Sequence, residues 1–106
     1  MIGCGDKNRS EAVRYHAKAV EALIENGVCT SPDDCSKKKA SFWAGAKPWG
    51  EQTHIILYGI TEPKTVDRVA DKLRLERKSM AHGVILKAYS SQHDQTKQEI
   101  ATVEIE

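Results

Sequence analysis

The sequence has few aromatic residues, a nearly even charge balance and no long apolar run. Its 106 residues include one phenylalanine, two tryptophans and three tyrosines, and 16 basic side chains stand against 15 acidic ones. The net charge of +1 lacks the basic excess that nucleic-acid binders need, so we expect no nucleic-acid partner. No stretch approaches the ~20 apolar residues that cross a bilayer, so the sequence predicts no membrane-spanning segment.

Length and composition indicate one folded domain. A chain of 106 residues is long enough to bury one hydrophobic core but not two. Apolar residues make up 40% of the chain and charged residues 29%, so enough surface can be buried to offset the entropy of the unfolded chain. We therefore expect a single compact domain.

The first residues form a short pattern around Cys4. Ile2 and Gly3 precede this cysteine, and Gly5 and a polar stretch over residues 6–9 follow it. The pattern resembles the cleavage box of bacterial lipoprotein signal peptides, in which the cysteine after the cut carries a diacylglycerol. The resemblance implies that Cys4 is lipidated and that the chain is tethered to a membrane. It divides the chain into an anchor box with a short extended tether (residues 1–9) and one α+β domain (residues 10–106).

The same resemblance implies a location. In enterobacterial lipoproteins, an aspartate directly after the cysteine retains some of them at the inner membrane, and Gly5 stands there instead. We therefore expect the bacterial cell envelope, at the periplasmic side of the outer membrane. This interpretation requires charged and apolar signal segments before Met1. The alternative is that Cys4 is an ordinary thiol and the protein is cytosolic.

Once Cys4 is set aside for lipidation, Cys29 and Cys35 remain as a pair. The periplasm permits disulfides, so we predict a structural bond between them. Zinc is the alternative, with Cys4 or a histidine as further ligand, but no pair has a close spacing such as C-x2-C. A redox dithiol would need C-x-x-C, and five residues separate these two cysteines. We expect no metal site and no cofactor.

Helical signals occur in three segments. Ser10 can cap a helix that Gly27 ends, with one apolar stripe and a charged face that includes Glu11. Ser31 and Pro32 start a second, short helix, which we expect to run towards Phe42 and Trp43 and to stop at Gly45 or Pro48. A third helix starts at residues 61–63. Its core positions are Val66, Val69, Ala70 and Leu73.

Strand signals also occur in three segments. Residues 54–60 are β-branched and aromatic with few polar positions, which favours a central strand. Residues 84–89 and 100–105 alternate, and the second of these places Ala101, Val103 and Ile105 inward. The predicted order is α-α-β-α-β-β, with a parallel pair around the third helix and a final antiparallel hairpin. The predicted fold class is α+β: a two-layer sandwich with helices on one face of a mixed three- or four-stranded sheet.

Aromatic and basic residues gather in the middle of the chain. They form either a recognition surface for a partner protein, glycan or lipid headgroup, or a loop whose aromatics fill the core beneath solvated lysines. Large aromatics usually supply core area in a small domain, which favours the second interpretation. The residues are Phe42, Trp43, Trp49, Lys37, Lys38 and Lys39.

The segment from Cys29 to Tyr89 resembles small, functionally unassigned lipoproteins of Gram-negative bacteria. The resemblance rests on Asp34-Cys35, the three lysines, Phe42-Trp43, the run over residues 57–60 and the β-α-β unit. It implies no catalytic residue, and no histidine stands beside a Ser or Cys nucleophile in a catalytic motif. We expect a lipid-anchored binding module that contacts an envelope protein, as immunity, exclusion or assembly lipoproteins do. The alternatives are a small cell-wall or lipid hydrolase and a cytosolic regulatory domain.

Overall fold

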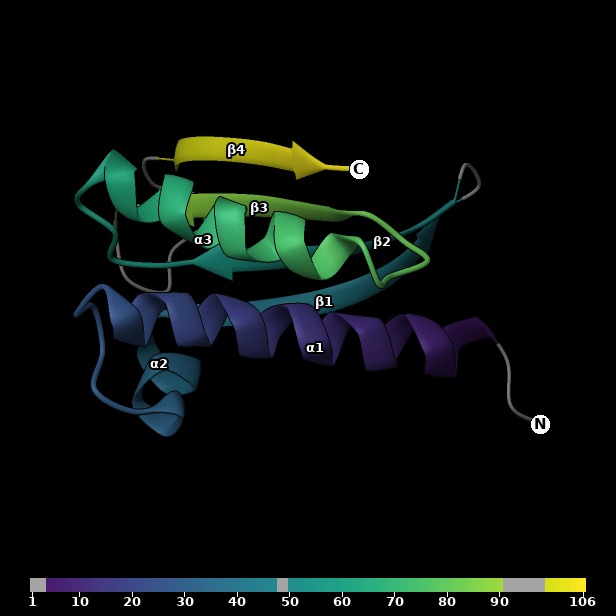
Figure 1. Cartoon of the computed structure of the whole chain (residues 1–106), viewed down its shortest axis with the longest axis horizontal. Coiled ribbons are helices and arrows are strands. Elements are labelled where there is room, and N and C mark those ends of the chain that lie inside the picture. The colour runs from purple at the N-terminus through teal and green to yellow at the C-terminus, as the bar shows by residue number, and fades with distance from the viewer. Residues whose placement is uncertain (1–3, 48–49, 91–98) are drawn as a thin grey trace.

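Three helices and four strands make up the protein (Figure 1). The computed structural model describes residues 4–47, 50–90 and 99–106, and within these the side chains of all but residues 4–9, 37–38, 43–47 and 50–52. The elements, in chain order, are α1 (Cys4–Glu25), α2 (Pro32–Lys38), β1 (Ala40–Lys47), β2 (Gly50–Leu57), α3 (Pro63–Arg77), β3 (Val84–Tyr89) and β4 (Glu99–Ile105).

The strands form one mixed sheet in the order β1-β2-β3-β4. β2 and β3 are parallel and are joined through α3, while β3 and β4 pair antiparallel, as the sequence predicted. β2 is a central strand, again as predicted. The edge strands are β1 and β4.

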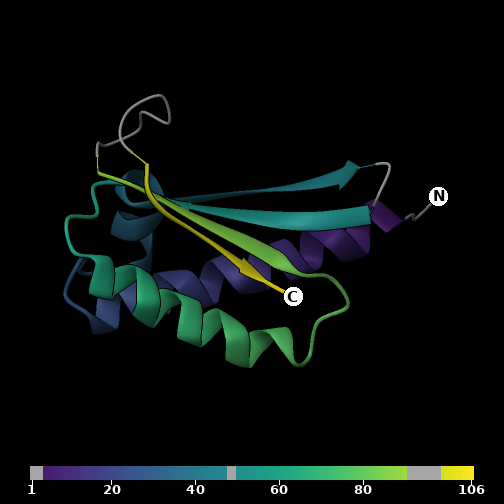
Figure 2. The same ribbon diagram turned by 90° about the horizontal axis from the view of Figure 1, so that it is seen from above.

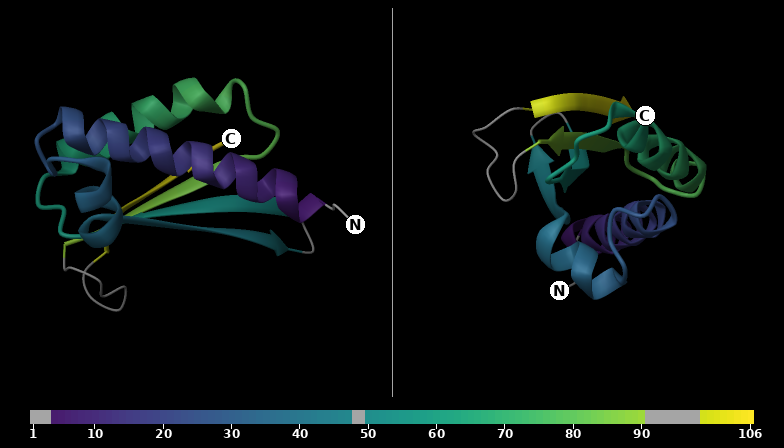
Figure 3. Two further views of the ribbon diagram at one scale, coloured as in Figure 1. Left: turned by 90° about the horizontal axis from the view of Figure 1, so that it is seen from below. Right: turned by 90° about the vertical axis from the view of Figure 1, so that its left-hand side faces the viewer.

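All three helices lie on one face of this sheet (Figures 2 and 3). The predicted two-layer α+β sandwich is therefore confirmed. The core forms between the layers, where alternate residues of β2 and β3 meet α1 and α3. Its largest fully buried side chains include Tyr15, Leu23, Ile55, Leu57, Leu73 and Leu86. The positions predicted as the core face of α3 are all buried.

The predicted element order was wrong at one point. The second helix ends at Lys38, and Ala40–Lys47 forms a strand where we expected the helix to continue towards Phe42 and Trp43. This strand pairs antiparallel with β2, from Ala40 opposite Leu57 to Lys47 opposite Gly50. The true order is α-α-β-β-α-β-β. Pairing with the next strand overrides local helix signals, and aromatic residues suit a strand better than a helix.

The start of the first helix was also placed wrongly. Ser10 does not cap it, because α1 begins six residues earlier at Cys4. Residues 4–9, which the sequence analysis assigned to the anchor box and short tether, therefore form the first turns of this helix. Among residues 5–9, Lys7 and Arg9 propagate a helix well, and Asp6 carries a negative charge in the first turn, where the helix dipole favours it. None of the described helices is long and apolar enough to cross a membrane.

Candidate functional site

A disulfide joins Cys29 and Cys35, as the sequence predicted. Gly27 ends α1 with a φ of 76°, a conformation that favours glycine. Ser31 caps α2 by accepting a hydrogen bond from the backbone N–H of Asp34 at 3.2 Å. The two cysteine Cα atoms are 5.5 Å apart, and both side chains are buried in the main core. The disulfide thus holds the short helix α2 against the C-terminal end of α1.

A groove of about 340 Å³ lies between α1 and α2, and we call it the α1–α2 groove. Val20 and Ile24 of α1 and Pro32 of α2 make it mainly apolar, and Glu21 is the one formally charged residue among those that line it. The full lining is His16, Ala17, Val20, Glu21, Ile24, Pro32 and Ser36. Such a groove suits apolar groups better than charged ones.

The apolar side of α1 that lines this groove continues along the helix beyond the reach of α2. At 100° per residue, Val13, Ala17, Val20 and Ile24 lie on one side of the helix, and we call them the outer stripe. α2 has seven residues and lies beside only the C-terminal part of α1 (Figures 1 and 3). Val20 is 5% exposed, whereas Val13 is 47% exposed. The N-terminal half of the outer stripe is therefore apolar surface without a cover in the described part of the chain.

His16 connects this groove to the edge of the sheet. Its ring lies 4.9 Å from that of Phe42 on β1, centroid to centroid, with the planes tilted by 46°. Burial lowers the pKa of His16, and a hydrogen bond to the backbone of Ala40 partly offsets that shift. His16 is therefore a neutral, half-buried wall of the groove near pH 7.

Only part of the predicted aromatic and basic surface lies within the described part of the chain. Phe42 is half-buried and packs against the main core. Lys39 is half-buried, and its Nζ lies 3.5 Å from the carbonyl oxygen of Gly59. A Cβ at Gly59, whose φ is +62°, would lie 2.8 Å from that Nζ, so a side chain there would displace the lysine. Trp49 and the side chains of Lys37, Lys38 and Trp43 lie outside the described part of the chain.

The sequence pattern placed Glu11 on the charged face of the first helix, and the structure shows this side chain buried instead. It is 7% exposed, and its carboxylate accepts hydrogen bonds from the backbone N–H groups of Ala81 at 2.7 Å and His82 at 3.0 Å. Tyr15 donates its hydroxyl to the carbonyl oxygen of His82 at 2.7 Å. Burial raises the pKa of Tyr15 to about 12. These contacts bind the loop after α3 to α1, and no local sequence signal pairs residues so far apart.

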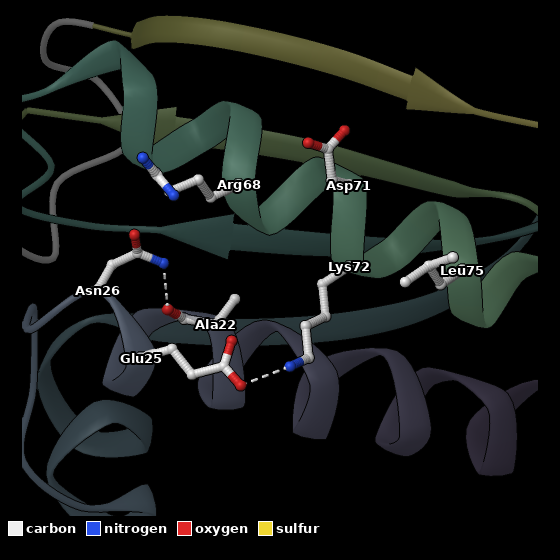
Figure 4. A pocket seen from close by; sticks show the side chains of 7 residues that line it. All are labelled: Ala22, Glu25, Asn26, Arg68, Asp71, Lys72 and Leu75. Carbon is white, nitrogen blue, oxygen red and sulfur yellow. Dashed lines mark hydrogen bonds and ion pairs between the residues drawn. The ribbon is translucent and has the colours of Figure 1, made fainter.

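A second groove, of about 330 Å³, separates α1 from α3 (Figure 4). Lys72 bridges its two walls, 2.7 Å from Glu25 and 3.2 Å from Glu21. Arg68 extends over the groove from α3, and Leu75, which is 67% exposed, lies further along the same helix. The ion pairs of Lys72 with Glu21 and Glu25 join α1 to α3 across this groove, so we interpret it as part of the interface between the two helices.

The described residues contain no group of three or more His, Cys, Asp or Glu side chains that could hold a metal ion. The histidines are dispersed: His16 lies on α1, His54 on β2 and His82 after α3, while His93 lies outside the described residues. The side chain of Cys4 lies outside them as well. The α1–α2 groove is therefore the candidate functional site.

No family model matches the chain, and neither the curated proteins nor the solved structures contain a match. The geometry of the α1–α2 groove is therefore the basis for a functional proposal.

Proposed function

We propose that the protein is a lipid-anchored binding module of the bacterial envelope, which takes an amphipathic helix of a partner protein onto the outer stripe of α1. The single observation that carries the proposal is the apolar stripe that α2 leaves uncovered, with Val13 at 47% exposure. An exposed apolar row that continues a formed groove is typical of a protein contact site.

The packing of α2 supports a helix as the occupant. α2 already covers Val20 and Ile24, so the outer stripe is shaped to receive a helix along its length. A partner helix with apolar residues at i, i+3 and i+4 would cover Val13 and Ala17 in the same way. His16 and Glu21 at the border of the groove offer polar contacts to its edges.

The place of Cys4 supports a partner at the membrane. Val13 follows Cys4 by nine positions in one continuous helix, a rise of about 14 Å along the helix axis. A diacylglycerol on Cys4 would therefore hold the open end of the groove close to the lipid surface. Two acyl chains bind a bilayer stably, at about 0.8 kcal/mol for each buried methylene.

Cross-linking at position 17 tests the contact. A photo-reactive phenylalanine derivative in place of exposed Ala17, in cells that carry the full gene, should give a discrete adduct on illumination. The same derivative at Asp67, an exposed residue of α3, is the control. The partner identified from the adduct is then purified, and its affinity is measured for wild type, Ala17→Arg and Asp67→Arg.

We expect Ala17→Arg to weaken this affinity at least tenfold, because it places a large charged side chain over the groove, and Asp67→Arg to change it less than twofold. Equal adducts at both positions would contradict the proposal, as would an affinity that Ala17→Arg leaves unchanged.

The anchor is tested separately. In cells that express the gene with its upstream segment, a fatty-acid analogue should label the wild type and leave Cys4→Ser unlabelled. Wild type should also sediment with membranes, and Cys4→Ser should not. An unlabelled wild type would remove the anchor from the proposal while the cross-linking result stood on its own.

A further inference from the structure

None of the helices in the described part of the chain lies over the second face of the sheet (Figures 2 and 3). Leu86 and Ala88 of β3 point into the main core, so Ile85, Lys87 and Tyr89 lie on the opposite face. The same alternation places Thr102 and Glu104 of β4 on that face, because Ile105 lies in the main core and Val103 packs against it. We call this surface the open face.

The open face is partly apolar. Ile56, Tyr58 and Tyr89 form a second buried cluster, separate from the main core. The two tyrosine rings stack with centroids 6.3 Å apart, and the hydroxyl oxygens of Ser41 and Tyr58 lie 3.2 Å apart. Burial, followed by the charge of Glu99, raises the pKa of Tyr89, so its phenol stays neutral near pH 7.

Two opposite charges stand in the middle of this surface. Lys87 lies directly opposite Thr102, and Glu104 lies opposite Ile85, so the lysine and the glutamate are diagonal neighbours on adjacent strands. Diagonal positions of this kind are about 7–8 Å apart. Within the described part of the chain, neither side chain forms an ion pair or a hydrogen bond. Lys87 is half-buried beside the apolar cluster, where an unpaired cation gains most from a partner.

We infer that the open face is a contact between two copies of this chain, in which Lys87 of each copy pairs with Glu104 of the other. A two-fold contact sets residue i against residue j and j against i, so it requires a patch that carries both signs of charge. A foreign acidic or basic partner would instead favour a patch with one sign. Two sheets that pack face to face also cover apolar side chains such as Ile85. The open face lies on the other side of the sheet from α2, so the contact would leave the α1–α2 groove accessible.

Charge reversal tests this inference. Sedimentation equilibrium of the full chain, with Cys4→Ser in every sample to exclude cross-linking through that thiol, should show a monomer–dimer equilibrium. Lys87→Glu and Glu104→Lys should each raise the dimer dissociation constant at least tenfold, because each brings like charges together. The double variant, Lys87→Glu with Glu104→Lys, should return it to within about threefold of wild type, because every pair is restored with its signs exchanged.

Lys78→Glu, an exposed change just after α3, is the control and should leave the dissociation constant unchanged. Far-ultraviolet circular dichroism establishes that each variant is folded, and Glu104→Lys, an exposed change on an edge strand, serves if Lys87→Glu does not fold. A wild type that stays monomeric at millimolar concentration would overturn the inference. A dimer that is insensitive to the single reversals, or that the double reversal fails to restore, would overturn it as well.

Discussion

The two apolar sides of α1 differ in what covers them. One side carries Ala12, Tyr15, Ala19, Ala22 and Leu23, all at most 1% exposed against the sheet and α3. The other side is the outer stripe, whose exposure falls from 47% at Val13 to 5% at Val20, where α2 lies over it. A helix with two apolar sides in so small a domain has more apolar surface than one sheet can cover. The buried side therefore contributes to folding, and the exposed side is the surface to which the proposed function assigns a partner.

Truncation in the core should have the largest effect. Leu23→Ala removes a fully buried side chain and leaves a cavity, so we expect the free energy of unfolding to fall by about 2 to 5 kcal/mol. Val13→Ala on the outer stripe should change it by less than about 0.5 kcal/mol. Urea unfolding measures both. Similar losses at the two positions would show that the sides do not differ in this way.

Loss of the disulfide should come next. Replacing Cys29 and Cys35 by serine releases a short loop and should lower the free energy of unfolding by about 2 kcal/mol. Because the bond holds α2 over the outer stripe, amide exchange should accelerate in α2 more than in α3. Mass spectrometry of unreduced wild type should find the two thiol hydrogens missing. Free alkylation of both sulfurs without reductant is the outcome that would count against the bond.

Tyr15 offers a smaller effect with a defined pH dependence. Tyr15→Phe removes the hydrogen bond to the carbonyl of His82 and should cost about 1 kcal/mol at pH 7. The pKa of Tyr15 is raised from 10.0 to about 12, so folding favours the neutral phenol. Its stabilising effect is complete below pH 10 and is lost as the pH rises from 10 towards 12. Wild type should therefore lose more stability across that window than Tyr15→Phe does, as unfolding at a series of pH values would reveal.

His16 should give the smallest effect, on the groove side. Its pKa is lowered from 6.5, so folding favours the neutral imidazole. The stability that this shift supplies is complete above pH 6.5 and is lost as the pH falls through the lower pKa of the folded state. His16→Gln should remove that acid sensitivity, and a two-dimensional NMR titration of the imidazole should find a pKa below 6.5. An imidazole that titrates above 6.5 would contradict the half-buried position.

The sequence predicted those elements that local patterns determine. The spacing of Val66, Val69 and Leu73 locates α3, and alternation locates β3 and β4, because these signals depend on neighbours a few residues apart. β1 was missed because its pairing with β2 is a contact between strands that no local pattern reports, and the Ser31-Pro32 start favoured a longer helix. Glu11 was misplaced because its two hydrogen-bond donors lie 70 and 71 residues away.

The candidate site was likewise predictable from the sequence only in part. The spacing of Cys29 and Cys35 indicated their pairing, but the groove that the disulfide supports depends on how far α2 extends along α1. The helix α2 ends at Lys38, and this end depends on the pairing of Ala40 with Leu57 in the sheet. Periodicity did indicate a broad apolar surface on the first helix. It did not separate the side that the sheet covers from the side that remains exposed.

The most direct measurement of the division between the two sides of α1 uses one variant in two assays. Ala17→Arg keeps a good helix former at an exposed position, and its guanidinium can pair with Glu21 one turn later. The free energy of unfolding measured in urea should therefore match that of wild type within about 0.5 kcal/mol. In the same protein, binding to the partner cross-linked at position 17 should be at least tenfold weaker. A variant that loses about 2 kcal/mol or more of stability while keeping wild-type affinity would show that the outer stripe serves the fold and not a partner.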